Sequence, residues 1–191
     1  IDGARLMAIQ GFDPYSAAAG VQSALLNADP GCLSARAREL RKQGQGTLAQ
    51  QLLANRPPLM ARPLLRDKWV DELLVNARGA LANGDVRSAV AIARSVDDAF
   101  DANEDISQRG YDLRDDYTSL VWLGGPQSLW SLGDGAGAAP LFLRYGQAAR
   151  TPGTRAKGFY WAGRAAAQAG LTGAAQRYFA MAARYADQFY G

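Results

Sequence analysis

Residues 154–191 read TRAKGFYWAGRAAAQAGLTGAAQRYFAMAARYADQFYG, and this stretch decides the fold class predicted for the chain. Its small and aromatic residues recur at spacings of three and four, which places them on one face of a helix. Gly170 interrupts the pattern, which then resumes on a second segment. The stretch therefore predicts two helices joined by a glycine turn and packed closely through small residues. The predicted packing positions are Phe159, Ala162, Gly163 and Ala166 in the first helix and Ala175, Phe179 and Ala182 in the second.

Similar helix pairs are expected upstream, because one pair cannot bury its apolar face alone. The pattern recurs around Gly133 and Gly84, and more weakly around Gly44. The pairs follow the outline of tetratricopeptide units, but the four turn glycines are unevenly spaced and depart from that repeat's period of about 34 residues. No stretch alternates apolar and polar residues over the length of a strand. The sequence therefore predicts an all-α chain, an irregular α-solenoid or superhelix of tetratricopeptide-like helix pairs.

A chain of 191 residues is long enough to bury a core, so we expect a single α-superhelical domain over 1–191. Its expected parts are weaker N-terminal helices over 1–66, middle helix pairs over 67–153 and the last pair over 154–191. The chain begins without Met, and we expect it to be a piece of a longer protein.

Proline and glycine mark the expected connections. The prolines between Arg56 and Pro63 exclude a continuous helix there, because each lacks a donor and restricts the residue before it. The polar segment Asp101–Asp112 is expected to be a loop. Gly124-Gly125-Pro126 predicts a kink or a break in a helix, and Thr154 is the expected N-cap of the last pair.

Charge is distributed unevenly along the chain. The net charge is only +3, yet the segment from Gly135 to Ala186 contains no Asp or Glu. Acidic residues gather before it, between Asp97 and Asp116. The basic segment either pairs with this acidic region or attracts an anionic partner through its long-range field, and the sequence leaves both readings open. Its basic residues are Arg144, Arg150, Arg155, Lys157, Arg164, Arg177 and Arg184.

Four polar residues of the last pair form a stripe separate from the packing face, namely Lys157, Tyr160, Arg164 and Gln168. A cation, a ring, a second cation and an amide suit a polar, partly anionic ligand such as a glycan that carries carboxylates. Together with the nearby Arg155, they are the candidate ligand-binding residues. The alternative is that Tyr160 packs against a neighbouring unit and Arg164 is a solvated or capping group.

The residue types argue against most catalytic chemistry in this chain. It contains no histidine, which excludes every Ser-His, Cys-His and His-metal arrangement. No phosphate-binding or dinucleotide-binding motif is present, and we expect no cofactor and no metal site. The dispersed arginines are typical of a solvated helix face, so nucleic acid is not an expected partner. No segment has the unbroken apolar length of a transmembrane helix.

The last pair resembles the end of the superhelical domain of soluble lytic murein transglycosylases. The C-terminal half of the chain carries most of the resemblance, including DDYTSLVWLGG and LWSLGDGAGAAPLF, whereas residues before about Asp67 match only in helical character. The matching residues of the last pair are Arg155, Ala156, Tyr160, Trp161, Gly163, Arg164 and Ala165, followed by Phe189, Tyr190 and Gly191.

The resemblance implies a periplasmic, Gram-negative enzyme of cell-wall turnover. Its relatives cleave the bond between N-acetylmuramic acid and N-acetylglucosamine of peptidoglycan and leave a 1,6-anhydro end. Their catalytic Glu stands in a Glu-Ser dipeptide of a lysozyme-like domain, downstream of the superhelix. None of the three glutamates here, Glu39, Glu72 and Glu104, precedes a serine, so no catalytic residue carries over.

We therefore expect a non-catalytic scaffold that positions or binds murein strands. Its expected partners are peptidoglycan glycan strands and its own downstream catalytic domain. A helical-repeat module that binds another protein is the alternative, and a large exposed apolar patch would favour it. A third possibility is a purely architectural domain without a ligand.

Overall fold

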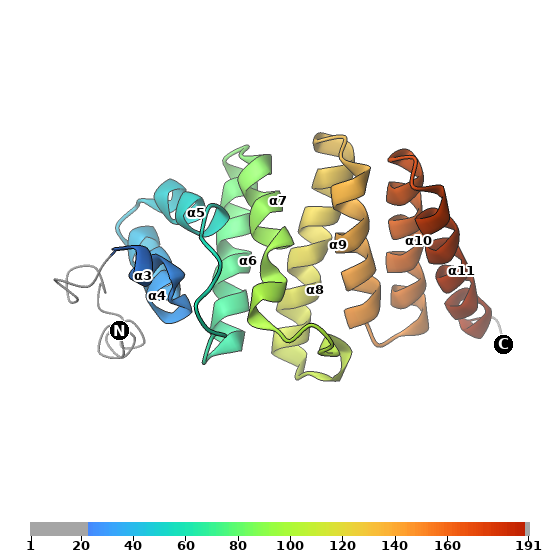
Figure 1. Ribbon diagram of the computed structural model, residues 1–191, viewed down its shortest axis with the longest axis horizontal. Helices are drawn as coiled ribbons and strands as arrows, with labels where there is room; N and C mark the ends of the chain where they lie inside the picture. The colour runs from blue at the N-terminus through green and yellow to red at the C-terminus, as the bar shows by residue number, and fades with distance from the viewer. Residues whose placement is uncertain (1–22, 190–191) are drawn as a thin grey trace. The chain divides into compact units, whose positions relative to one another are not determined.

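The computed structural model describes residues 23–189, and within them all regular structure is helical, with no strand (Figure 1). This confirms the all-α prediction. Ile1 to Gln22 and the last two residues of the FYG motif, Tyr190 and Gly191, lie outside the described residues. The described chain forms two compact units, one ending at Ala102 and one beginning at Asn103.

From Ser23 onward, the first unit contains five α-helices and a short 3-10 helix, and polar residues begin several of them. Asp29 caps α4 by accepting from the backbone N–H of Cys32, and Pro30 occupies the first helical turn. Asp85 caps α7 in the same way through the N–H of Ser88. The elements are α3 (Ser23–Ala28), α4 (Pro30–Lys42), α5 (Gly46–Ala54), α6 (Arg66–Ala82), α7 (Val86–Arg94) and η1 (Val96–Ala99).

The second unit contains four long helices, and consecutive ones lie side by side and antiparallel in Figure 1. They are preceded by a short 3-10 helix within the predicted loop. The elements are η2 (Ile106–Gln108), α8 (Tyr111–Pro126), the π-helical turn η3 (Gln127–Ser131), α9 (Gly135–Ala148), α10 (Pro152–Gln168) and α11 (Thr172–Phe189).

The four predicted turn glycines all end a helix in the structure. Gly44, Gly84, Gly133 and Gly170 have φ values of 74°, 77°, 63° and 75°, which is the left-handed region that glycine enters without steric cost. The predicted helix-turn-helix pairs around them are present, and no helix crosses the proline-containing segment between Ala54 and Arg66.

Two local predictions need correction. The N-cap of α10 is Thr151 and not Thr154, because Pro152 is itself well suited to the first helical position and moves the start upstream. The hydroxyl of Thr151 accepts from the N–H of Thr154 at 3.3 Å. For the kink or break predicted at Gly124-Gly125-Pro126, the correction is one of position within the motif: α8 continues through both glycines and changes to a π-helical turn directly after Pro126.

The core of the first unit is built from branched aliphatic side chains. Leu33, Leu53, Leu73 and Ile92 are each 0% exposed. Two ion pairs are packed beside this core. Arg41 binds Glu72 through two parallel bonds of 2.7 and 2.8 Å, and Arg56 binds Asp98. Burying these charges is tolerated because each has a partner of opposite charge.

Glycines and phenylalanines instead join the helices of the second unit. The ring of Phe142 lies against Gly125, and that of Phe159 against Gly146. Phe179 lies against Gly163 in the same way. In each case the glycine lies on one helix and the phenylalanine that packs against it lies on the next. A Cβ at any of these glycines would approach the ring within 2.8 Å, so the absence of a side chain is what lets the ring fit.

Candidate functional site: the aromatic and basic surface of the second unit

The predicted stripe on α10 is separated from the packing face, as its spacing indicated. Its four residues, Lys157, Tyr160, Arg164 and Gln168, are all exposed. The four predicted packing residues of the same helix, Phe159, Ala162, Gly163 and Ala166, are all buried. The stripe therefore faces away from the core, and its surroundings decide what it can bind.

Lys157 lies against aromatic rings from the two preceding helices. Its Nζ is 4.0 Å from the ring centroid of Trp122 on α8 and 5.6 Å from that of Tyr145 on α9. Trp122 and Tyr145 also contact each other, with ring centroids 4.6 Å apart. The Tyr145 phenol is neutral at physiological pH, and burial raises its pKa further above the ordinary value. The ammonium is thus held on ring faces, a cation–π arrangement.

Arg164 lies over two neighbouring rings of its own helix. Its guanidinium carbon is 5.5 Å from the ring centroid of Trp161 and 5.8 Å from that of Tyr160. Nη1 also donates to the Tyr160 hydroxyl at 2.8 Å. Stacking and this bond orient the planar guanidinium, whose fork of N–H groups matches a carboxylate.

Tryptophans extend the aromatic surface beyond the predicted stripe. Trp130, in η3, is 60% exposed and makes an edge contact with Trp161 at 5.1 Å between ring centroids. Tyr160, which is 41% exposed, contacts Trp161 at 5.4 Å. We call Trp130, Lys157, Tyr160, Trp161 and Arg164 the α10 surface. Trp130 was missed because it is remote in sequence from the stripe.

The remaining two candidate residues serve mainly as connections within the unit. The side-chain oxygen of Gln168 accepts from the backbone N–H of Gly135 at 3.0 Å, and its nitrogen donates to the carbonyl of Gly133 at 3.2 Å. Arg155 donates to the backbone carbonyls of Gln147 and Ala149. Gln168 thus holds the start of α9, and Arg155 holds its end. Both residues therefore have a structural role.

An apolar hollow runs beside the α10 surface, along α10 and α11. Tyr160 and Trp161 form one wall, and Phe179 and small residues of α11 form the other. An alanine-lined wall of this kind has little to offer a charged ligand but can accept an apolar side chain. The residues from α11 are Phe179, Ala182, Ala183 and Ala186.

The acidic pair Asp97-Asp98 has a role that the sequence did not reveal. Asp98 accepts from Arg56 at 2.8 Å, and Trp69 Nε1 lies 3.4 Å from its other oxygen. Burial raises the pKa of Asp98 and lowers that of Arg56, and their mutual attraction opposes both shifts. No local motif indicates the contact, because Arg56 lies in the proline-containing segment after α5 and Asp98 lies in η1, and only folding brings them together.

No family model, no curated protein and no solved structure matches this chain. Among the described residues, no group of three or more His, Cys, Asp or Glu side chains is placed to hold a metal ion. None of the helices in the described part is both long and apolar enough to span a bilayer. Function is therefore inferred from the α10 surface itself.

Proposed function

We propose that this chain is a non-catalytic scaffold domain that binds peptidoglycan glycan strands through the α10 surface. In this proposal the helix pairs stack as an irregular α-solenoid within a periplasmic lytic transglycosylase, whose own catalytic domain cleaves the strand. The observation that carries the proposal is the continuous row of Trp130, Trp161 and Tyr160 with Arg164 stacked on it.

Sugar rings and carboxylates explain this combination of side chains. The apolar face of a pyranose ring packs on an aromatic ring, and exposed tryptophans provide large, rigid surfaces for that contact. Peptidoglycan also carries carboxylates on its lactyl groups and stem peptides. Arg164 is oriented to meet a carboxylate, and Lys157 adds a second positive charge on the same helix.

The electrostatic surroundings support the same ligand. The segment from Gly135 to Ala186 has no acidic residue, so the local field of α9, α10 and most of α11 is positive. Such a field increases the rate at which a polyanionic strand is captured, even where individual contacts are weak. Binding that depends on it should weaken as salt is added, because exposed charges are screened over about 10 Å at 0.1 M ionic strength.

Co-sedimentation with purified, insoluble peptidoglycan tests the proposal. We expect the wild-type chain to sediment with the polymer. Trp130→Ala and Arg164→Glu should each weaken binding about tenfold, which corresponds to the loss of about 1.4 kcal/mol. The matched controls are Tyr111→Ala, which removes an aromatic ring that is 69% exposed, and Arg177→Glu, which reverses an exposed charge on α11.

Two outcomes would overturn the proposal. One is a wild-type chain that stays in the supernatant, which would leave an architectural role. The other is equal loss of binding in the control variants, which would indicate attraction to net charge alone. Chitin, an insoluble glycan of the same sugar type without lactyl groups or stem peptides, separates ring stacking from carboxylate recognition, because only the Arg164 contribution should be lost with it.

A protein-binding module is the second candidate, and the apolar hollow along α10 and α11 favours it. Phe179 and the alanines beside it suit an apolar side chain from a partner better than they suit a sugar. Ala183→Glu places a charge in this hollow without touching Trp130 or Arg164. Because Lys157, Tyr160 and Trp161 line both surfaces, the decisive comparison is with Trp130 and Arg164, which lie outside the hollow. Under the glycan proposal, Trp130→Ala and Arg164→Glu weaken binding to peptidoglycan more than Ala183→Glu does.

A further inference from the structure

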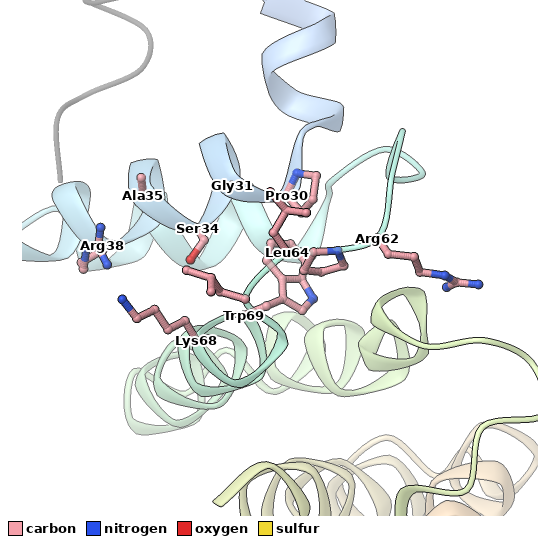
Figure 2. Close-up of a pocket in the computed structure, with 11 residues that line it drawn as sticks. Pro30, Gly31, Ser34, Ala35, Arg38, Arg62, Leu64, Lys68 and Trp69 are labelled. Carbon is pink, nitrogen blue, oxygen red and sulfur yellow. The ribbon is translucent and has the colours of Figure 1, made fainter. Parts of the chain in front are cut away.

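A separate pocket lies in the first unit, between α4, the proline-containing segment and the start of α6 (Figure 2). Its walls are mainly apolar, with the buried ring of Trp69 among them. The volume is about 50 Å³, on a measure by which one water occupies about 10–15 Å³. That is room for one branched aliphatic group and not for a long chain. The apolar wall residues are Pro30, Ala35, Pro63, Leu64, Leu65 and Trp69.

The pocket wall is rigidly held from behind. Trp69 is only 1% exposed, and the Arg56 guanidinium lies 5.0 Å from its ring centroid. The indole N–H points to Asp98. On the other side, the proline-containing segment is tied down by a bond from the N–H of Met60 to the carbonyl of Ala28 at 2.9 Å. A preformed wall lowers the entropic cost of binding.

Large apolar side chains remain exposed at the mouth of this pocket. Leu64 is 75% exposed and Leu65 is 45% exposed, although the neighbouring Pro63 is buried. Clustered leucines beside a cavity are typical of a surface that contacts an apolar group. A ligand seated in the pocket would remove part of this area from water, which is favourable by roughly 25 cal/mol per Å².

The charge at the rim of the pocket indicates that the ligand also carries a negatively charged group beside its apolar one. The described residues that line the pocket include three cations, Arg38, Arg62 and Lys68, and no acidic residue. Figure 2 shows Arg38 and Lys68 on the same side of Leu64, with Arg62 extending away on the opposite side. Arg62 pairs with Asp101 at 3.4 Å, so Lys68 is the rim cation considered for a ligand.

We propose that this pocket binds an α-carboxylate that carries one branched aliphatic side chain, the chemistry of a leucine or valine at a peptide C-terminus or in a small acylated amino acid. The aliphatic group enters the apolar cavity beside Trp69. The carboxylate stays at the rim, where Lys68 attracts it. The site is distinct from the α10 surface, and its test does not depend on peptidoglycan binding.

Titration of the ¹⁵N-labelled chain with N-acetyl-leucine, followed by NMR, tests this proposal. The expected response is saturable shifts at the amides of Leu64 and Lys68 and at the Trp69 indole, with a dissociation constant of roughly 1 mM for so small a ligand. N-acetyl-leucinamide has the same shape without the charge and should bind at least tenfold more weakly. N-acetyl-glycine lacks the aliphatic group and should also bind at least tenfold more weakly.

Variants separate the two halves of the site. Ser34→Leu on α4 fills the cavity and should abolish the shifts, whereas Lys68→Glu should weaken binding at least tenfold. Lys42→Glu makes the same charge change on α4 away from the pocket and should bind like the wild type. Equal binding of the acid and the amide, or unchanged binding in Ser34→Leu, would overturn the proposal, as would the absence of saturable shifts.

A short peptide distinguishes the two sources of the carboxylate. If acetyl-Gly-Gly-Leu binds at least tenfold more tightly than N-acetyl-leucine, the pocket recognises peptide C-termini, since the added backbone then contributes. Equal affinity identifies the terminal residue alone as the ligand. Both results support the carboxylate-and-aliphatic chemistry, and failure of both ligands to bind contradicts it.

Discussion

The two units of this chain use the same turns but pack their helices by different means. Gly84-Asp85 in the first unit and Gly133-Asp134 in the second each place a left-handed glycine before an aspartate that caps the next helix. The first unit then fills its interior with leucines and paired charges. The second brings its helices together through glycines that receive phenylalanine rings.

The packing contacts of the two units also differ in their use of cations. In the first unit, the partly exposed Arg41 and the buried Arg56 each bind a carboxylate beside the core. Glycine–phenylalanine contacts in the second unit need no charged group, so Lys157 and Arg164 remain on the surface. Each unit thus contains cations of both kinds, because Arg56 and Arg155 bond within the fold whereas Lys68 and Arg164 are exposed. A count of arginines would not separate them.

The largest expected effect comes from a methyl group placed between two helices of the second unit. A Cβ in Gly158→Ala would lie 2.5 Å from the backbone nitrogen of Gly146 and 2.9 Å from the carbonyl oxygen of Phe142. Backbone cannot move aside as a side chain can, so we expect about 3 kcal/mol less stability in urea denaturation.

Gly173→Ala is the matched control for that change. Its Cβ would find nothing closer than 3.7 Å, at the end of the flexible Arg177 side chain. Because alanine favours a helix over glycine, this variant should be unchanged or up to about 1 kcal/mol more stable. Similar losses in both variants would show that the close approach of α9 and α10 is not what stabilises the second unit.

In the first unit, the substitution expected to destabilise the fold most is one that leaves a buried charge without its partner. Asp98→Ala leaves the Arg56 guanidinium buried without its carboxylate, and we expect a loss of about 2 kcal/mol, reduced from the value for a fully buried pair because Asp98 is partly exposed. Adding Arg56→Met should recover part of this loss, since no unpaired buried charge then remains.

An exposed ion pair provides the control for Asp98. Asp101 binds Arg62 at 3.4 Å with side chains that are 83% and 51% exposed, so Asp101→Ala should change the urea midpoint little. If the Arg56→Met, Asp98→Ala double variant is no more stable than Asp98→Ala alone, then the unpaired charge is not the cause of the loss.

The smallest expected effects come from the aspartate N-caps that follow the left-handed glycines in both units. Asp85→Ala and Asp134→Ala each remove a helix cap, and each should cost about 1 kcal/mol at pH 7. Asparagine at either position can still accept the capping bond and should cost less. A markedly larger loss at one position would show that the two turns are not equivalent.

The Asp85 variant also has a defined pH dependence. Bonds from the Ser88 side chain and backbone hold the pKa of Asp85 below its usual value in the folded state. Its contribution is therefore fully present above the unfolded carboxyl pKa of about 3.9 and is lost as the pH falls through the lower folded value. Thermal unfolding of wild type and Asp85→Ala should differ at pH 7 and converge toward pH 2.

The fold class and much of the α10 surface could be predicted because their signals are local. Helical spacing put Lys157, Tyr160 and Arg164 on a different face from Phe159 and Ala162, and burial follows that division. The start of α10 was misplaced because Thr151 and Thr154 are both good caps, and the preference of Pro152 for the first turn decides between them.

Contacts between segments remote in sequence were beyond prediction. Trp130 joins the α10 surface because a π-helical turn after Pro126 brings it to Trp161, and Gln168 is engaged by the start of α9. The pocket beside Trp69 depends on three segments meeting. Sequence periodicity specifies the side of a helix on which a residue lies, but not which residues of other segments contact it.

The sequence by itself thus determined the helices, their glycine turns and the sides on which their polar residues lie, because these follow from backbone geometry over a few residues. Tertiary structure alone decided which cations are buried in pairs and which remain on the surface. It also decided which glycine receives which ring, since these contacts depend on how each helix packs against the next.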